Sequence, residues 1–492
     1  MSIQSALLIA ASSLNVEQQQ TNLIANNIAN ASTPGYVQEE LPQSELVNGT
    51  TGDGVVAGQI QLISDQAAAT AANQASGSQA YSQALVNGLT PYLSQLGQAT
   101  DSSSLPEMLS TFSQSLTNLS SNPSDPSTQT AAITAAQNLA STLNGLDSSV
   151  QGAREQADQA IGADVTTVNS TLNQLAQNKA QLKSAAAQGQ STAPFVDTQN
   201  TLLTTLSNIV PIKVFQTGDN GIVVTTDQGT TLLDGQVHQL SFTPTPNITD
   251  SMSVTADPAT GLTGGLSAVT VDGQPIAMSQ SGDLAAQLQL RDNVLPQFAD
   301  QLNEFAGNLI TGFQQADPTV TSGETGLFTA GGAAVDAGNP AQVPGLAGSI
   351  AVNASVDPSQ GGEAYRVVAG AHATSQGNAS DNTTVLNFIQ ALQQTQSYSS
   401  ASGLPSSMTL DDAVSQVAGF QQATLTNWTS LNTSRSSQAQ AAQATLSNQT
   451  GVNVDDQLER LMAVQQTYEA SSEIISTVTQ MFNSLTQAVS QP

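Results

Sequence analysis

The sequence contains no cysteine and only two histidines in 492 residues. Without cysteine the chain cannot form disulfides, thiolate metal ligands or a thiol nucleophile. His238 and His372 belong to no H-x-x-x-H pattern, so a zinc site is not expected. The sequence also lacks the G-x-x-x-x-G-K-[ST], G-x-G-x-x-G and G-x-S-x-G motifs. We therefore expect no enzyme, no metal and no cofactor; the open alternative is a hydrolase that uses one of the two histidines.

Charged residues are scarce and mostly acidic. They make up 9% of the chain, against about 25% in an average domain, and 8 Lys and Arg face 37 Asp and Glu. The resulting net charge of -29 argues against nucleic acid and against an anionic membrane surface as partners. Aromatic residues amount to 4%, so cores built on large rings are not expected.

Long apolar runs are absent too. No stretch reaches the roughly 20 apolar residues that a membrane span requires. The N-terminus, MSIQSALLIAASS, has no Lys or Arg before its short apolar run, which argues against a cleaved secretory signal. If the protein leaves the cell, we expect a route that leaves this end intact.

What the sequence does contain is a narrow apolar stripe at each end. Residues 3–28 predict a helix with a coiled-coil repeat, because apolar residues recur at alternating spacings of four and three. The repeat consists of Ile3, Leu7, Ala10, Leu14, Glu17, Thr21, Ile24 and Ile28. The turn Thr33-Pro34-Gly35-Tyr36 ends the helix, with Gly35 suited to the positive φ of a type II turn.

The C-terminal segment has a matching repeat. Asn453 is the expected N-cap, with Asp455 and Asp456 in the first turn, where the helix dipole favours negative charge. The stripe then runs through Val454, Leu458, Leu461, Val464, Tyr468, Ser471, Ile475, Val478, Phe482, Leu485 and Val489. Two such stripes at opposite ends predict that the terminal helices pair.

Between the ends, helix is expected over about 65–210 with breaks at 120–129 and 187–194, and then after residue 281, at 382–398 and at 410–448. Pro296 marks a helix start or kink, and Thr409 with Asp412 forms an N-cap signature. Strands are expected in VPIKVFQ, GIVVTT and TTLLDG, and in LSAVTVDGQPIAM around an Asp272-Gly273 hairpin turn. The predicted fold class is mainly α with β-containing central domains: paired terminal helices, an inner helical bundle domain and a β-rich outer insertion.

This pattern predicts seven segments along the chain. They are an N-terminal helix and turn (1–40), the first part of a helical domain (41–210), a hairpin-rich segment (211–281), a further helix of the helical domain (282–316), a small β or irregular domain (317–380), the last part of the helical domain (381–450) and a C-terminal helix (451–492).

Three asparagines, Asn26, Asn27 and Asn30, crowd the end of the first helix. About ten buried aliphatic side chains contribute on the order of 15–30 kcal/mol. Ordering about 40 residues costs roughly 1.5 kcal/mol each. A terminal pair on its own is therefore marginal, and neighbouring subunits would bury more surface. The amides could then bond across subunit boundaries; simple capping of the helix end is the equally open alternative.

The stretches LIANNIANASTPGY and GVNVDDQLERLMAVQQTYEASSEIISTVTQMFNSL resemble the terminal signatures of bacterial flagellar axial proteins, the rod, hook and junction components. Three internal stretches resemble the family's hook–filament junction members: LSSNPSDPSTQTAAITAAQNLASTLN, residues 194–235 and residues 281–310. Residues 317–380 match no part of the family pattern.

The resemblance implies a non-catalytic structural subunit, exported by the flagellar type III pathway to the hook–filament junction. It implies self-association into a ring, with hook protein on the proximal side and a second junction protein on the distal side. It also implies an export chaperone at the C-terminal region, no nucleic acid and no membrane insertion. The alternative is another axial protein, a hook or distal-rod subunit.

The resemblance assigns the inner-tube interface between subunits to both ends of the chain. The predicted interface residues are Leu7, Leu14, Ile24, Asn26, Asn27, Ile28, Asn30, Pro34, Gly35, Tyr36, Leu458, Leu461, Tyr468, Ile475, Met481, Phe482 and Leu485.

Overall fold

A computed structural model describes residues 3–33, 35–48, 51–98, 101–217, 221–257, 261–335 and 343–490. Helix accounts for 62% of the structure, and the strands form small sheets of two or three. The predicted class, mainly α with β-containing central segments, is confirmed. The chain divides into two compact units, each built from separate stretches of sequence.

Unit 1 comprises residues 1–77, 168–239 and 435–492. Its helices are α1 (Ile3–Asn30), α5 (Ala193–Ile209) and α12 (Val454–Ser490), with parts of α2 (Gln66–Leu96), α4 (Pro126–Ala187) and α11 (Leu410–Thr450). Its strands are β1 (Glu39–Glu40), β2 (Gln43–Asn48), β3 (Thr51–Ala57), β4 (Gln61–Leu62), β5 (Ile212–Thr217), β6 (Gly221–Thr226) and β7 (Thr231–Leu233).

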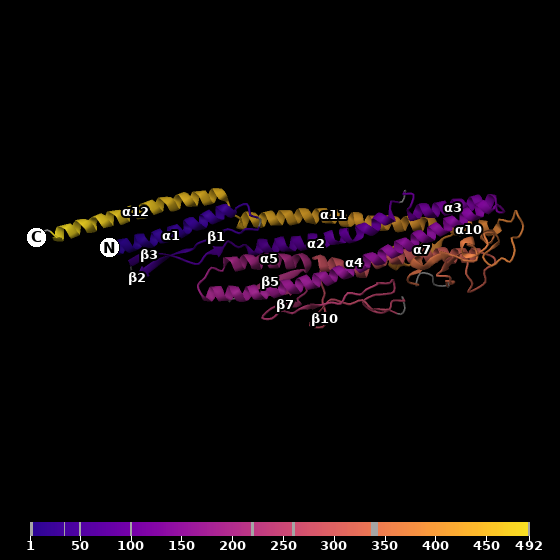
Figure 1. The fold of residues 1–492 in the computed structure, drawn as a ribbon, viewed down its shortest axis with the longest axis horizontal. Coiled ribbons are helices and arrows are strands. Elements are labelled where there is room, and N and C mark those ends of the chain that lie inside the picture. The colour runs from indigo at the N-terminus through magenta and orange to yellow at the C-terminus, as the bar shows by residue number, and fades with distance from the viewer. Residues whose placement is uncertain are drawn as a thin grey trace. The chain divides into compact units, whose positions relative to one another are not determined.

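The terminal helices α1 and α12 lie side by side in unit 1 (Figure 1). They are antiparallel, because Asn27 near the end of α1 contacts Gln457 at the start of α12, and Glu17 in the middle of α1 contacts Ser471 in the middle of α12. The Asn27 amide donates to Gln457 Oε1 at 3.3 Å, and the Ser471 hydroxyl donates to Glu17 Oε1 at 3.4 Å. The predicted pairing of the two ends is present in the structure.

On α12 the buried side chains recur every seven residues, at Gln457, Val464, Ser471 and Val478. This spacing is that of a coiled-coil stripe facing one partner. Two of the four positions are polar. The α1–α12 contact is therefore specified by hydrogen bonds as well as by apolar packing.

A hairpin that the sequence analysis did not predict packs against α1. It is formed by β2 and β3, paired antiparallel from Gln43–Ala57 to Asn48–Thr51. The Val55 amide donates to Ser12 Oγ at 3.2 Å. Gly54 has a φ of +129°, and a Cβ there would overlap Ser12 Oγ, so only glycine allows this approach. The hairpin was not predicted because residues 43–57 are rich in polar residues and glycine, a composition typical of loops.

The three-stranded sheet β5-β6-β7 of unit 1 matches the strands predicted within residues 210–235. Its strands are antiparallel, with Ile212 opposite Thr226 and Val224 opposite Leu233. Lys179 attaches this sheet to α4, because its Nζ donates to the Ile222 and Asp234 carbonyls at 3.1 and 2.7 Å.

Unit 2 comprises residues 78–167 and 240–434. Its helices are α3 (Leu105–Ser121), α6 (Asp283–Gln289), the π-helical segment η1 (Leu290–Val294), α7 (Leu295–Ala316), α8 (Leu346–Ser349), the 3₁₀ turns η3 (Pro358–Gln360) and η4 (Ser400–Ser402), α9 (Arg366–Ala369), α10 (Thr383–Gln393) and the remainder of α2, α4 and α11. Its strands are β8 (Leu240–Ser241), β9 (Thr270–Val271), β10 (Gln274–Pro275), β11 (Phe328–Ala330), β12 (Ile350–Val352), β13 (Gln396–Ser397) and β14 (Ser407–Met408).

Unit 2 has one continuous apolar core around α7. Phe313 lies at its centre, with ring centroids 5.5, 5.3 and 5.0 Å from Phe112, Phe328 and Phe388. The expectation that large rings would not build a core is therefore wrong. Few aromatics are present, but the fold gathers four of them in one place, where edge and offset contacts add to apolar burial.

Residues 317–380 contribute to this same core rather than forming one of their own. Leu327, Leu346, Ile350 and Val367 are all buried in it. The seven-segment division itself remains a prediction.

Several local predictions are confirmed. Thr409 Oγ1 accepts from the Asp412 amide at 3.1 Å at the start of α11, and Asn453 Oδ1 accepts from the Asp455 amide at 3.0 Å at the start of α12. Asp272 and Gly273 both have positive φ, 51° and 77°, in the hairpin β9–β10. Pro296 lies in the first turn of α7, directly after the π-helical segment.

Candidate assembly interface

The Asn27 side chain bonds the end of α1 to the turn that follows it, to β1 and to the start of α12. Its side chain is fully buried (0% exposed). Its Nδ2 donates to the Glu39 carbonyl at 2.9 Å and to Gln457 Oε1. Its Oδ1 accepts from the Tyr36 hydroxyl at 2.9 Å and from the Glu39 amide at 3.1 Å. The predicted bond from Asn27 to a neighbouring subunit is therefore wrong, because its amide is fully used within the chain.

Asn26 and Asn30 stabilise the helix end. Asn30 Nδ2 donates to the Asn26 carbonyl at 3.0 Å and to Asn26 Oδ1 at 2.9 Å. The Thr33 hydroxyl in turn donates to Asn30 Oδ1 at 3.3 Å. For these two asparagines the structure shows the capping alternative.

The turn after α1 brings Tyr36 back to Asn27. The Tyr36 amide donates to the Thr33 carbonyl at 3.1 Å and Gly35 has a φ of +81°, as predicted for this turn. Pro34 lies outside the described residues. Burial and then the nearby Glu39 carboxylate raise the pKa of Tyr36 to about 12, so its hydroxyl stays a donor at neutral pH.

The predicted interface residues on α1 and α12 separate into two groups. Ile24 is buried, and Leu14, Ile28, Leu461 and Ile475 are half-buried. Those that the chain leaves exposed are Leu7, Leu458, Tyr468, Met481, Phe482 and Leu485.

Leu458, Tyr468, Phe482 and Leu485 belong to the stripe predicted to pair the terminal helices, but within one chain they are about half exposed. Three of the four covered positions, Val464, Ser471 and Val478, belong to the predicted stripe. The fourth is Gln457, and Leu458 lies about 100° around the helix from it. Since Ser471 is level with Glu17, Val478 is level with Ala10, and few turns of α1 remain to cover Phe482 and Leu485.

Exposed apolar side chains concentrate on these same elements. Among the described residues, 19 large apolar side chains are exposed, and 14 of them lie on α1, β2–β3 and α12. They are Leu7, Leu8, Leu46, Val47, Val56, Val454, Leu458, Met462, Tyr468, Ile474, Met481, Phe482, Leu485 and Val489. We call this set the terminal apolar surface. Exposed apolar residues gathered in this way indicate a protein–protein contact.

A hollow of about 300 Å³ lies beside Asn27, between α1, β1 and α12. Leu23, Ile24 and Val464 supply apolar walls. Arg460 pairs with Glu40 at 3.3 Å at this site, and both side chains are about half exposed. Gln457 Nε2 is buried without a partner in the described structure.

Unit 2 contains a buried polar stripe that the sequence analysis missed. Asp147, Gln151, Arg154 and Asp158 follow one another along α4 at spacings of four, three and four, the spacing of one helix face. In a helix so poor in charge this pattern was a usable signal.

Two buried arginines, Arg154 and Arg291, connect this stripe on α4 to other segments of unit 2. Arg291 is fully buried and donates to Asp158 Oδ1 at 2.7 Å, while Arg154 donates to the Thr249 and Met252 carbonyls at 3.0 and 2.8 Å. Asp158 Oδ2 accepts from the Thr245 amide at 2.6 Å. Two of the chain's eight basic residues are thus committed to internal structure.

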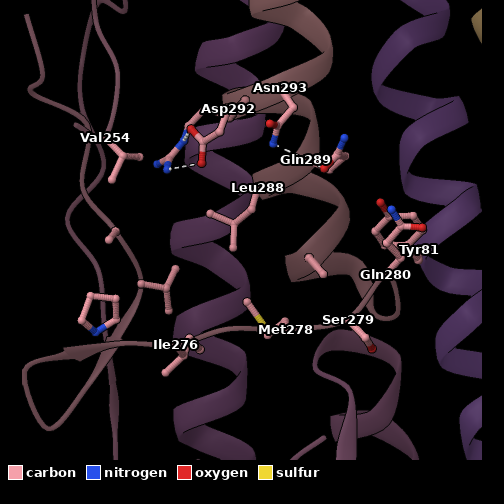
Figure 2. Close-up of a pocket in the computed structure, with 15 residues that line it drawn as sticks. Tyr81, Val254, Ile276, Met278, Ser279, Gln280, Leu288, Gln289, Asp292 and Asn293 are labelled. Carbon is pink, nitrogen blue, oxygen red and sulfur yellow. Dashed lines mark hydrogen bonds and ion pairs between the residues drawn. The ribbon is translucent and has the colours of Figure 1, made fainter. Parts of the chain in front are cut away.

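A second hollow, of about 280 Å³, lies next to Arg291. Figure 2 shows Val254, Ile276, Met278 and Leu288 around it, with Asp292 and its ion pair to Arg291 on one side. No described residues cluster in a way that could hold a metal ion, and no described helix is long and apolar enough to cross a membrane.

Comparison with known proteins gives three matches along the chain. Residues 93–326 match the family described as the flagellar hook-associated protein FlgK helical domain. Residues 7–36 match the flagella basal body rod protein family, and residues 443–488 match the C-terminal family of the basal body rod FlgEFG proteins. The chain is thus similar to flagellar hook-associated proteins through its middle and to flagellar rod proteins near both ends.

Individual relatives carry the same name. Flagellar hook-associated protein 1 of Salmonella typhimurium is 30% identical over 248 residues, which cover 48% of this chain and 44% of that protein. Its Bacillus subtilis namesake is 24% identical over 412 residues, covering 76% and 78%. The solved flagellar hook junction protein FlgK of Burkholderia pseudomallei is 21% identical, with a TM-score of 0.43 over 54% of this chain and 47% of that one. The chain thus spans less than half of the Salmonella relative.

Proposed function

We propose that this hook-associated protein 1 relative is a non-catalytic structural subunit of the bacterial flagellum, which forms the adaptor ring between hook and filament. The observation that carries the proposal is the terminal apolar surface: 14 of 19 exposed large apolar side chains lie on the terminal helices and the adjoining hairpin. A surface of this kind needs a protein partner. The relatives are named flagellar hook-associated protein 1, so we expect that partner to be a component of the flagellum.

The exposed predicted residues are the proposed contacts between subunits. Leu458, Tyr468, Met481, Phe482 and Leu485 leave the α1–α12 pair with an unfilled apolar face. A neighbouring copy would cover it in the ring. With a net charge of -29, subunits repel one another at long range, so short-range apolar contact must drive association.

The proposed partners follow from the same role. Hook protein would lie on the proximal side and a second junction protein on the distal side. An export chaperone would bind the exposed C-terminal helix before type III export, without cleavage of a signal. The proposal includes no cofactor, no nucleic acid and no membrane insertion.

The nearest alternative is another axial protein, a hook or distal-rod subunit. The matches of residues 7–36 and 443–488 to rod-protein families favour it as the second candidate. The match over 93–326 favours the junction role instead, because that family is described as a hook-associated helical domain.

Electron microscopy of cells that lack the gene, combined with an assay of flagellin in the medium, tests the proposal. Hooks without filaments, with flagellin lost to the medium, support a junction protein. Cells without hooks would assign the protein to the rod or hook. Normal filaments would overturn both roles.

A further inference from the structure

Asp147 on α4 and Asp250 in the β8–β9 connection form a buried carboxyl pair within unit 2. Asp147 is 8% exposed, and its Oδ1 has no partner in the described structure. Gln151, one turn after Asp147 on the same face of α4, donates to Asp250 Oδ1, which holds the two carboxyl groups near each other. Two carboxyl groups held close together in a buried place favour sharing one proton.

The backbone of α8 is shaped around this pair. A side chain at Gly348 would overlap Asp147 Oδ2. Gly345, at the N-terminal end of α8, has a φ of +82°, and a Cβ added there would lie 3.5 Å from Asp250 Oδ2. A side chain at Gly348 would crowd Asp147, whereas Gly345 is favoured by its positive φ and leaves ordinary contact with Asp250.

The groups that face the pair do not balance two negative charges. From α4, Arg154 faces it and Gln151 Nε2 donates to Asp250 Oδ1. From α7, Asn303 faces Asp250 and lowers its pKa, and Asp300 adds a further carboxyl near Asp250 and Arg154. Arg154 is thus the single facing cation in the described structure. Full ionisation would leave excess negative charge in a largely buried place.

Asp250 lies inside the segment that Arg154 holds on α4. The guanidinium donates to the Thr249 and Met252 carbonyls on either side of it. The Ile248 amide, just before, donates to Glu155 Oε1 at 3.0 Å. Repulsion between Asp147 and Asp250 would therefore act directly on residues 248–252.

We propose that residues 248–252 form a proton-linked latch, seated on α4 while Asp147 and Asp250 share a proton and loosened when both carboxyl groups ionise. Burial, and then the other carboxyl group, raise the pKa of Asp147 above its usual range; burial also raises that of Asp250. Raised acid pKa values favour the seated form at low pH, and this advantage is lost as pH rises through the folded-state pKa. The latch loosens toward alkaline pH.

Hydrogen–deuterium exchange of the full chain between pH 5.5 and 8.5, corrected for the intrinsic pH dependence, tests the proposal. In the wild type, protection of residues 248–252 should fall by about tenfold, the effect of one pKa unit. In Asp147→Asn the amide can donate to Asp250 without a titrating proton, so protection should stay high at pH 8.5. Asp250→Asn should behave in the same way.

Asp125→Asn, which changes an exposed carboxylate just before α4, is the matched control and should keep the wild-type profile. The proposal is overturned if protection of residues 248–252 in the wild type does not change with pH. It also fails if both isosteric variants retain the wild-type pH profile, or if they lose protection throughout α4 and α7. In that last case the carboxyl groups would be needed for folding rather than for a proton-dependent latch.

Discussion

Asn27 and Gln457 are 430 positions apart in the sequence, yet their side-chain amides are hydrogen-bonded at 3.3 Å in a fully buried site. This bond joins the end of α1 to the start of α12. The same Asn27 side chain holds Tyr36 and Glu39, so one residue fixes the helix end, the following turn and the partner helix.

Asn27→Ala should destabilise unit 1 by roughly 2–4 kcal/mol, because it leaves the Tyr36 hydroxyl, the Glu39 amide and the Gln457 amide without their buried partner. Urea unfolding followed by circular dichroism measures the loss. Asn22→Ala, at an exposed position one turn earlier on α1, is the control and should change stability little. Equal stability of the two variants would contradict the role assigned to Asn27.

Phe482→Glu should prevent self-association while leaving the monomer as stable as the wild type, because the side chain is 57% exposed and available to a neighbouring copy. Leu14→Glu and Ile475→Glu should prevent assembly and also lower stability, since both sites are half-buried. Both effects should leave unit 2 folded. Sedimentation and restoration of filaments in cells lacking the gene provide the readouts.

The matched control for this series is Leu386→Glu on α10. Leu386 is 50% exposed, as the α12 residues are, but lies outside the terminal apolar surface. It should assemble normally. If Phe482→Glu also assembles normally, the assignment of the interface to α12 is wrong.

Arg291→Met should cost about 3–5 kcal/mol, because it leaves the fully buried Asp158 carboxylate without its ion-pair partner. Replacing both residues, in Arg291→Met with Asp158→Leu, should cost less than the single change, since no uncompensated charge remains. Denaturant unfolding of wild type, both single variants and the double variant gives the coupling. Additive losses would show that the two residues do not act as a pair.

Unit 2 should become more stable as the pH falls from 8 to 5. Burial raises the pKa of Glu304, which is 3% exposed, to about 7, and that of Asp164 to about 7. The protonated forms favour the fold, so this contribution is full at low pH and is lost as pH rises through about 7. Thermal melts should show a rise of roughly 1–3 °C on acidification.

Glu304→Gln should reduce that pH dependence, because glutamine replaces the protonated acid without titrating. Asp381→Asn should leave it unchanged, since local hydrogen bonds lower the pKa of Asp381 and keep it ionised throughout the range. Melting temperatures that fall on acidification in the wild type would refute the prediction.

The sequence by itself determined the features that depend on neighbouring residues. The helical repeats at both ends, the Thr33–Tyr36 turn, the N-caps Thr409 and Asn453 and the Asp272-Gly273 hairpin all follow from local periodicity, capping and backbone preferences. The terminal motifs, whose residues are contiguous, also resemble those of flagellar axial proteins, and the same stretches match flagellar rod-protein families.

Only the tertiary structure decided which face of each element is covered. Of the apolar repeat on α12, the position of α1 covers Val464 and Val478 and leaves Phe482 and Leu485 exposed. The full use of Asn27 within the chain and the burial of Arg291 against Asp158 likewise depend on partners more than 100 positions away. Periodicity predicts that a residue will be buried or paired. Its partner depends on how distant segments pack, and the spacing of residues along one helix carries no information about that packing.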